Sequence, residues 1–244
     1  MGMRVAAVTG AAGGMGRAIV ARLIEDGLHV AGLDLDASGL AAMAEQHGER
    51  FLPCPADLTR VKQVTQSFER IDARWGGLDA LVNNAGTCFM SDFPDIPAEE
   101  FDRQMQVNFY SAFHCCQAAV PRMLRRDGVK KIVNISSNGA YNFDVFDPPH
   151  YRASKAALDN LTKDLARRYA RDRIAVNSIA PAMTETPLFG VLSAEVLDRA
   201  IAQMPHGRAM QPSEIAAWVG FLVSPAGDIS SGNVIILNQG RDVR

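Results

Sequence analysis

Short apolar runs alternate with amphipathic stretches along the whole chain. Each run is four to six residues long and is bounded by Gly, Asp, Asn or Pro, which is typical of strands buried on both faces of a parallel sheet. The runs cover residues 4–8, 29–33, 78–82, 131–135, 174–179 and 234–237, and a weaker candidate interrupted by two prolines covers 51–57. Helical patterns lie between them, at about 15–26, 38–47, 60–74, 98–126, 151–171 and 212–223.

This alternation predicts a doubly wound, Rossmann-type α/β fold with a parallel sheet and helices on both faces. No charge block, low-complexity linker or repeat divides the chain, so we expect one dinucleotide-binding and catalytic domain over residues 1–244. The stretch at about 182–211 has no strand to pair and contains one probable helix, 193–204. Insertions of this kind commonly cover a site, and we expect this one to cover the substrate.

The first predicted strand runs into a glycine-rich turn, TGAAGGMG, at residues 9–16. Gly10, Gly14 and Gly16 allow a tight turn whose backbone N–H groups can approach a pyrophosphate at the start of the next helix. Asp34 ends the second strand, where a carboxylate can accept hydrogen bonds from ribose hydroxyls and repel a 2′-phosphate. The turn holds no basic residue and Arg17 already belongs to the helix, so the pattern favours NAD over NADP.

Tyr151 and Lys155 stand four residues apart in a helical segment, so their side chains share one face. A tyrosine hydroxyl, with a pKa of about 10, is too weak a base at neutral pH. One lysine charge at ~4 Å and an effective dielectric of ~20 is worth roughly 4 kcal/mol, or about three pKa units. We therefore expect Lys155, together with a positively charged nicotinamide, to bring the pKa of Tyr151 near 7, as ~7 suits acid–base catalysis best.

Seven motifs, in order, resemble those of the short-chain dehydrogenase/reductase family over essentially the whole chain. They are TGAAGGMG (9–16), AD (56–57), NNAG (83–86), MQVNF (105–109), IVNISS (132–137), Tyr151 with Lys155, and APAMTET (180–186). Three features depart from the family pattern: Ala182 replaces a usual Gly, LNQG (237–240) replaces a segment with an acid and two glycines, and the interval from Ser137 to Tyr151 is one residue longer. The last departure leaves Asn138 as an alternative to Ser137, although the strand aligns better with Ser137.

The resemblance implies a catalytic set of Asn108, Ser137, Tyr151 and Lys155. Tyr151 would be the general base or acid, Ser137 would stabilise the substrate oxygen, Lys155 would hold the nicotinamide ribose, and Asn108 would position a water in a proton path. The turn and the resemblance together predict that the cofactor contacts Gly10, Ala12, Gly13, Gly14, Met15, Gly16, Asp34, Asp57, Leu58, Asn84, Ala85, Gly86, Tyr151, Lys155, Ala182, Thr184 and Thr186.

The substrate pocket should come from three loops, at 87–90, 138–150 and 183–192. Its predicted lining is Phe143, Phe146, His150, Met183, Leu188 and Phe189. We expect His150 to be a pocket-wall or surface residue, and Asp144 and Asp147 to face solvent. An apolar enclosure of this kind favours a hydrophobic secondary alcohol, cyclic or aromatic, oxidised to a ketone.

Two other functions remain open. A 3-hydroxyacyl-CoA dehydrogenase or reductase would use the same chemistry on a thioester, with a basic patch at the site entrance for which Arg103, Arg122 and Arg208 are candidates. A nicotinamide-binding sensor or scaffold subunit without turnover would bind NAD but be indifferent to replacement of Tyr151.

Composition and charge limit the classes of partner and the cellular location that we expect. The chain has 25 basic and 27 acidic residues, a balance that favours a small-molecule substrate over nucleic acid or an anionic membrane. The first residues enter a strand directly, and no run reaches the ~18 apolar residues of a membrane span. Four cysteines without metal-ligand spacing suggest reduced thiols, no metal site and a cytoplasmic location. The resemblance also implies a homo-oligomer that pairs helices 108–126 and 151–171 between subunits, with a tetramer favoured over a dimer.

Overall fold

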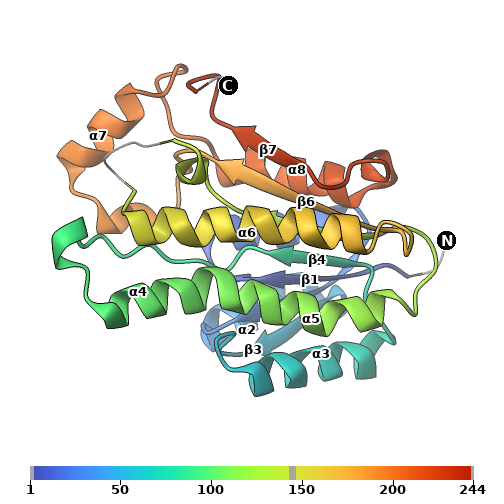
Figure 1. Cartoon of the computed structure of the whole chain (residues 1–244). Helices are drawn as coiled ribbons and strands as arrows, with labels where there is room; N and C mark the ends of the chain where they lie inside the picture. Colours follow the sequence, from blue (N-terminus) through green and yellow to red (C-terminus); the bar gives the residue numbers. More distant parts are fainter. Residues whose placement is uncertain (1–2, 143–146, 243–244) are drawn as a thin grey trace.

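The seven strands of the described residues join one parallel sheet, which confirms the predicted doubly wound fold, and their order is β3-β2-β1-β4-β5-β6-β7 (Figure 1). The computed structural model describes residues 3–142 and 147–242. The strands are β1 (Val5–Thr9), β2 (His29–Asp34), β3 (Phe51–Pro55), β4 (Ala80–Asn83), β5 (Lys130–Ile135), β6 (Ile174–Pro181) and β7 (Val234–Leu237). In register, Ala7 of β1 lies opposite Ala31 of β2 and Leu81 of β4.

The weakest predicted strand, 51–57, is confirmed as β3, which forms one edge of the sheet. β3 pairs only with β2, with Pro53 opposite Gly32. Proline lacks the N–H that a central strand needs for its second neighbour, and an edge strand tolerates this loss.

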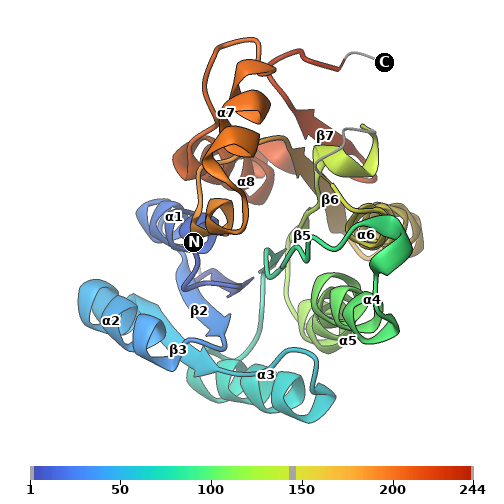
Figure 2. The same cartoon turned by 90° about the vertical axis from the view of Figure 1, so that its left-hand side faces the viewer.

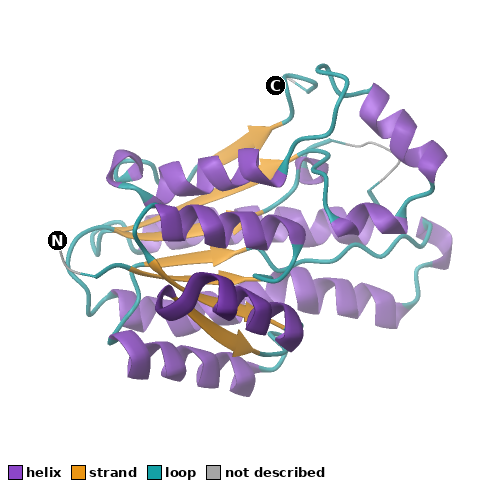
Figure 3. Ribbon diagram, turned by 180° about the vertical axis from the view of Figure 1, so that it is seen from behind, coloured by secondary structure: helices purple, strands orange, loops and turns teal. Residues whose placement is uncertain are grey.

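Helices cover both faces of the sheet (Figures 2 and 3). One core cluster packs helices α1, α2 and α8 against the sheet, and a second packs α3, α5 and α6 against the opposite face. The helices are α1 (Gly14–Glu25), α2 (Ala37–His47), α3 (Val61–Trp75), α4 (Ala98–Met105), α5 (Ser111–Met123), α6 (Pro149–Arg168), α7 (Ala194–Ala202) and α8 (Pro212–Val223). Short 3₁₀ segments are η1 (Gly48–Arg50), η2 (Phe93–Asp95), η4 (Asn138–Ala140), η5 (Pro187–Val191) and η6 (Pro225–Gly227). Among the described residues, no helix has both the length and the apolar character that crossing a membrane requires.

The prediction of one continuous helix over 98–126 is wrong in detail. A π-helical segment, η3 (Gln106–Tyr110), separates α4 from α5, and α5 ends at Met123. π-Segments of this kind often occur at functional sites, and this one carries the buried Asn108.

The strand order reverses direction between β1 and β4. In open α/β sheets such a switch point leaves a crevice outside the carboxyl ends of the strands, where ligands bind. The glycine turn after β1, the 83–86 turn after β4, and the Ser136–Ser137 end of β5 all lie at this edge. The segment 182–211, with η5 and α7, follows β6 at the same edge (Figure 1).

Candidate active site

A cavity of about 610 Å³ opens at the switch point. It is lined by most of the predicted cofactor residues: Gly10, Ala12, Gly13, Gly14, Met15, Gly16, Asp34, Asp57, Leu58, Asn84, Ala85, Gly86 and Thr186. Sequence reasoning missed eight others that line it: Leu35, Asp36, Ala56, Thr59, Arg103, Val107, Ser111 and Pro187. Most of these flank a motif that was identified, whereas Val107 and Ser111 reach the cavity from the π-segment and the helix after it.

The glycine turn fits an anionic dinucleotide phosphate. Gly10 has a φ of +63°, and a Cβ there would lie 2.9 Å from Ala85 Cα. A Cβ at Gly16 would overlap the carbonyl oxygen of Gly10. Helix α1 starts here after Gly13, which offers no side-chain cap, so its first N–H groups remain available to an anion.

The side chain of Asn84 fastens this turn to the end of β4. Its Nδ2 donates to the carbonyl oxygens of Thr9 at 3.0 Å and Gly10 at 3.1 Å. In return, Thr9 Oγ1 accepts from the backbone N–H groups of Asn84 and Ala85 at 2.9 and 3.0 Å. The two strand ends on either side of the switch point are therefore held together before any cofactor binds.

Asp34, Asp36 and Asp57 line this cavity, and Asp34 and Asp57 are the two carboxylates predicted to contact the cofactor. Asp34 accepts hydrogen bonds from the backbone N–H groups of Ala12 at 2.9 Å and Asp36 at 3.0 Å, which fix its orientation. Asp57 accepts from the backbone and the hydroxyl of Thr59 at 3.0 and 2.7 Å. Burial alone would raise the pKa of Asp57, but these hydrogen bonds and nearby arginine charges lower it overall.

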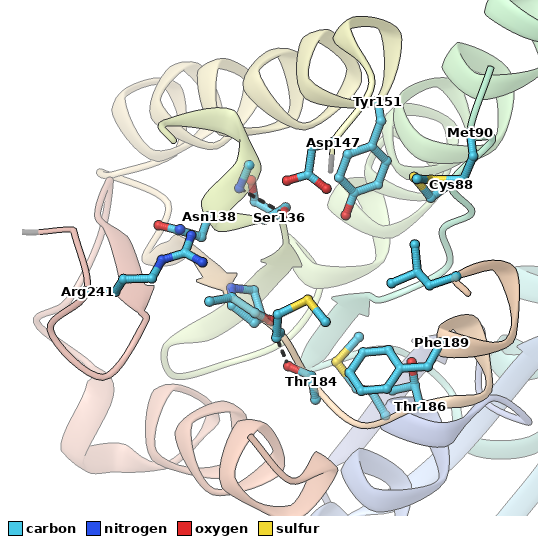
Figure 4. Close-up of a pocket in the computed structure, with 17 residues that line it drawn as sticks. Cys88, Met90, Ser136, Asn138, Asp147, Tyr151, Thr184, Thr186, Phe189 and Arg241 are labelled. Carbon is cyan, nitrogen blue, oxygen red and sulfur yellow. Dashed lines mark hydrogen bonds between the residues drawn. The ribbon is translucent and has the colours of Figure 1, made fainter. Parts of the chain in front are cut away.

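A second, smaller cavity of about 150 Å³ adjoins the first through Met15 and Thr186, which line both. Figure 4 shows Tyr151, Asp147, Cys88, Phe189 and Arg241 around it. Its other lining residues are Met90, Ser136, Ser137, Asn138, Gly139, Pro181, Ala182, Met183, Thr184 and Leu192. The predicted residues Ser137, Tyr151, Ala182, Met183, Thr184 and Phe189 therefore meet at one cavity.

The surroundings of Tyr151 oppose its ionisation. Burial raises the pKa of its hydroxyl above the ordinary value, the charge of Asp147 adds to this, and a side-chain hydrogen bond with Ser137 works in the other direction. Lys155 Nζ lies 5.9 Å from the centre of the tyrosine ring. In the chain by itself burial is therefore the largest effect on the Tyr151 hydroxyl, and the lowered pKa expected from Lys155 together with a positively charged nicotinamide stays a prediction.

Lys155 is buried and its Nζ donates to the carbonyl oxygen of Ile135 at 2.9 Å. Burial lowers the pKa of this ammonium to about 8, and the charge of Asp159 acts against the lowering. Lys155 and Asn108 converge on Gly86, where a Cβ would lie 3.3 Å from Lys155 Nζ and 3.5 Å from Asn108 Oδ1.

Asn108 is anchored to the loop after β4. Its Oδ1 accepts from the Thr87 N–H at 2.8 Å, and its Nδ2 donates to the Thr87 carbonyl at 3.0 Å and to Ser154 Oγ at 3.1 Å. The predicted role in placing a water remains a prediction.

The geometry separates Ser137 from Asn138. Ser137 acts against the rise in the pKa of Tyr151, with which it lines the same cavity, and its Oγ accepts from the Gly139 N–H at 3.0 Å. The Asn138 amide instead donates to Asp242 Oδ2 at 3.1 Å. The longer interval to Tyr151 is therefore absorbed after Ser137.

Several substrate-pocket predictions need correction. His150 is no pocket wall: it is 1 % exposed, and its Nε2 lies 3.1 Å from Glu100 Oε1 of α4. Asp147 lines the cavity and does not simply face solvent. Phe143, Phe146 and Asp144 lie outside the described residues, as does the side chain of Leu188. Arg241 of the C-terminal turn lines the cavity. No local pattern in the sequence predicts that Arg241 lies there.

The two other departures from the family pattern are accommodated locally. Ala182 donates its N–H to Leu237 O at 2.8 Å, and its φ is not positive, so its methyl group causes no backbone strain. Gln239 takes a φ of +59°, in a region glycine prefers. Its side chain accepts from the His206 N–H at 2.8 Å and donates to Arg208 O at 3.0 Å, which ties the C-terminal turn to the 182–211 segment.

Known proteins resemble this chain over nearly its full length. A family model described as enoyl-(acyl carrier protein) reductase matches residues 10–242. The 2,3-dihydroxy-2,3-dihydro-p-cumate dehydrogenase of Pseudomonas putida is 32 % identical, over 97 % of this chain and 93 % of its own. The 3alpha-hydroxysteroid dehydrogenase of Mediterraneibacter gnavus is also 32 % identical, over 95 % and 94 %. The crystal structure of a 3-ketoacyl-(acyl-carrier-protein) reductase from Brucella melitensis, complexed with NADH, superimposes with a TM-score of 0.92 at 27 % identity, covering 98 % of both chains.

A doubly wound sheet with a phosphate-binding turn at its switch point, next to a cavity lined by a tyrosine and a serine with a buried lysine one helical turn from the tyrosine, defines a dinucleotide-dependent oxidoreductase. Within that class, the chain belongs to the short-chain dehydrogenase/reductase family, whose members use a nicotinamide cofactor.

Proposed function

We propose that this protein oxidises a hydrophobic secondary alcohol, cyclic or aromatic, to a ketone with NAD as the hydride acceptor. The observation that carries the proposal is that the two cavities meet at Met15 and Thr186, with Tyr151 and Ser137 both lining the cavity on the substrate side. A carbinol carbon held between them would face both a hydride acceptor and a proton acceptor.

Each active-site residue has a separate role in the proposed reaction. Ser137 donates to the substrate oxygen, Tyr151 takes the hydroxyl proton, and Lys155 holds the nicotinamide ribose and adds positive charge. A bound oxidised nicotinamide would supply the hydride acceptor and a positive charge. Lys155, together with such a charge, would favour the Tyr151 phenolate, which the burial of Tyr151 disfavours in the chain alone.

Asp34 supports the choice of NAD. Each of its carboxylate oxygens is held by one backbone N–H, which leaves lone pairs for ribose hydroxyls and a negative charge against a 2′-phosphate. Arg17, the first basic residue after the glycine turn, is exposed and donates its Nε to Ala12 O at 2.8 Å.

The lining of the smaller cavity supports an apolar substrate. Met15, Met90, Met183, Phe189 and Leu192 contribute side chains to it. The relatives in P. putida and M. gnavus are named for substrates with rings, which agrees with a cyclic alcohol.

A 3-hydroxyacyl thioester is the second candidate, and Arg241 at the cavity is the observation that favours it. The basic residues expected for this role lie elsewhere. Arg103 lines the dinucleotide cavity, Arg122 Nε is 2.8 Å from Asp72, and Arg208 pairs with Glu214 at 2.8 Å. Arg241 itself lies 3.0 Å from Asp242 Oδ2, which offsets its charge.

The test is NADH formation by the purified protein across secondary alcohols and 3-hydroxyacyl-CoA esters, with Tyr151→Phe as the matched variant. We expect turnover of alicyclic or aromatic alcohols, and a loss of about 10²- to 10⁴-fold in kcat in the variant with NADH binding retained. Preference for the CoA esters would favour the second candidate. NADH binding without turnover of any substrate would indicate a non-catalytic sensor or scaffold subunit.

A further inference from the structure

A buried carboxylate that the proposed reaction does not use lies next to Lys155. Asp159 follows Lys155 by one turn of α6 and is 3 % exposed. Asp159 Oδ2 accepts hydrogen bonds from Ser136 Oγ at 2.9 Å and from Tyr141 Oη at 2.8 Å. Its Oδ1 accepts from Ser178 Oγ at 2.6 Å.

The three hydroxyl donors come from three separate parts of the fold. Ser136 stands at the end of β5, directly before Ser137, while Ser178 lies within β6 and Tyr141 follows η4. Ser136 Oγ is also 3.3 Å from the carbonyl oxygen of Lys155. Asp159 therefore connects the helix that carries Tyr151 and Lys155 to the strand end that carries Ser137.

The hydroxyl donors suit an ionised carboxylate. A buried charge is tolerated when its lone pairs are satisfied and an opposite charge is near. Burial raises the pKa of Asp159 overall, and the hydrogen bonds from Ser178, Tyr141 and Ser136 and the charge of Lys155 act against this rise. Burial likewise lowers the pKa of the Lys155 ammonium, and the negative charge of Asp159 is the largest effect that raises this pKa.

Few other titratable groups act on this pair among the described residues. Lys155 faces Tyr151 on its own helix and the Cys88 thiol from the loop after β4. Asp159 faces the Tyr141 hydroxyl. Asn108, from the π-segment, is uncharged. Burial raises the pKa of the Cys88 thiol to about 12, so at neutral pH Asp159 is the anion that acts on Lys155.

We propose that Asp159 is a positioning residue of this active site, whose buried carboxylate keeps Lys155 charged at the working pH and fixes the end of β5 at Ser137. The inference rests on the proposed function, in which a charged Lys155 holds the nicotinamide ribose and supports Tyr151. Asp159 acts through Lys155 and Ser136 and touches neither substrate nor cofactor.

The test is Asp159→Asn, which keeps the size of the side chain and removes its charge. Lys155 then loses its proton at lower pH, so the alkaline limb of the kcat/KM–pH profile should move down by about one to two pH units. The weakening of NADH binding with rising pH, followed by nicotinamide fluorescence, should move in the same direction. Asp164→Asn is the matched control, since Asp164 is exposed on the same helix and lies 3.6 Å from Arg168.

A milder variant guards against misfolding of Asp159→Asn. Ser178→Ala removes one hydrogen bond and leaves the carboxylate charge in place, so the alkaline limb should stay at its wild-type position. A uniform loss of activity in Asp159→Asn, with the alkaline limb and the NADH-binding profile unmoved, would overturn the proposal and leave Asp159 a structural residue, as would an equal shift in Ser178→Ala. If the wild-type protein turned over no substrate, the proposed function would fail, and the NADH-binding profiles would still decide the role of Asp159.

Discussion

At the scale of single residues, burial disfavours the charged form of three titratable groups at the site. Tyr151 is disfavoured as a phenolate, Lys155 as an ammonium and Asp159 as a carboxylate. A neighbouring group of opposite charge offsets the free-energy cost of burying each charged form. A positively charged cofactor would further favour the phenolate of Tyr151. Perturbed groups of this kind are typical of active sites because their proton affinities must suit the reaction.

Asp34 provides a residue-scale prediction. The double variant Asp34→Ser/Leu35→Arg removes the carboxylate and adds a cation next to it, at a position where Leu35 is 66 % exposed. Loss of the carboxylate should lower kcat/KM with NAD by about 10- to 100-fold, since a hydrogen bond to a charged group is worth about 1.5–3 kcal/mol. NADP should become the better cofactor.

Steady-state kinetics with both cofactors measures this change. Asp26→Asn is the control, because Asp26 pairs with Arg22 at the far end of α1. An unchanged ratio of NAD to NADP efficiency in the double variant would contradict the assignment of Asp34.

The individual residues were predicted unevenly. Tyr151, Lys155 and Asp34 could be identified because a fixed spacing or a strand end gives each a recognisable place. Asp147, Asp159 and Arg241 could not, because their importance depends on neighbours far away in sequence: Asp159 meets Ser178, and Asn138 meets Asp242 near Arg241. His150 was misjudged for the same reason, since its neighbour Glu100 belongs to a different helix.

At the scale of elements, the turn between β1 and α1 depends on the absence of side chains. Gly16→Ala places a methyl group against the Gly10 carbonyl. We expect a loss of about 1–3 kcal/mol in the free energy of unfolding, the usual cost of overpacking, together with weaker NADH binding. Urea denaturation and fluorescence titration measure the two effects.

Gly190→Ala is the matched control for this turn. A Cβ at Gly190 meets nothing within 4 Å, and its φ is not positive. Equal stability of the two variants would show that the close approach at Gly16 has no energetic consequence.

Helix and strand positions followed well from the hydrophobic pattern, whereas interruptions did not. The weak run with Pro53 and Pro55 became an edge strand, and the pattern over 98–126 concealed a π-segment. A periodicity of 3.6 residues is an average over many positions and does not register one inserted residue. The π-segment is also the element that carries Asn108.

At the scale of the whole molecule, several exposed apolar side chains lie on two separate sets of helices. Phe101, Tyr110 and Leu124 are exposed on the α4–α5 side, and Trp218 and Phe221 on α8. Apolar surface of this kind favours burial against another protein surface. We propose that the chain forms a homo-oligomer, with a tetramer favoured because two separate surfaces are available.

Light scattering coupled to size exclusion tests the assembly. The double variant Trp218→Glu/Phe221→Glu should give a smaller species than the wild type, because a carboxylate buried in an interface is costly. Val61→Glu is the control, since Val61 is exposed on a different helix, α3. A wild-type monomer would contradict the prediction.

The sequence by itself determined the class of fold, and it predicted the cofactor-binding turn and the reacting residues. Strand runs, glycine spacing and a one-turn Tyr–Lys pair are local patterns, and local patterns are set by backbone geometry within a few residues. Only the tertiary structure decided which cavity the loops form, which side chains from distant strands meet at Asp159, and how far burial opposes the ionisation of Tyr151. Burial and electrostatics depend on every atom packed around a group, and packing joins residues that the sequence separates.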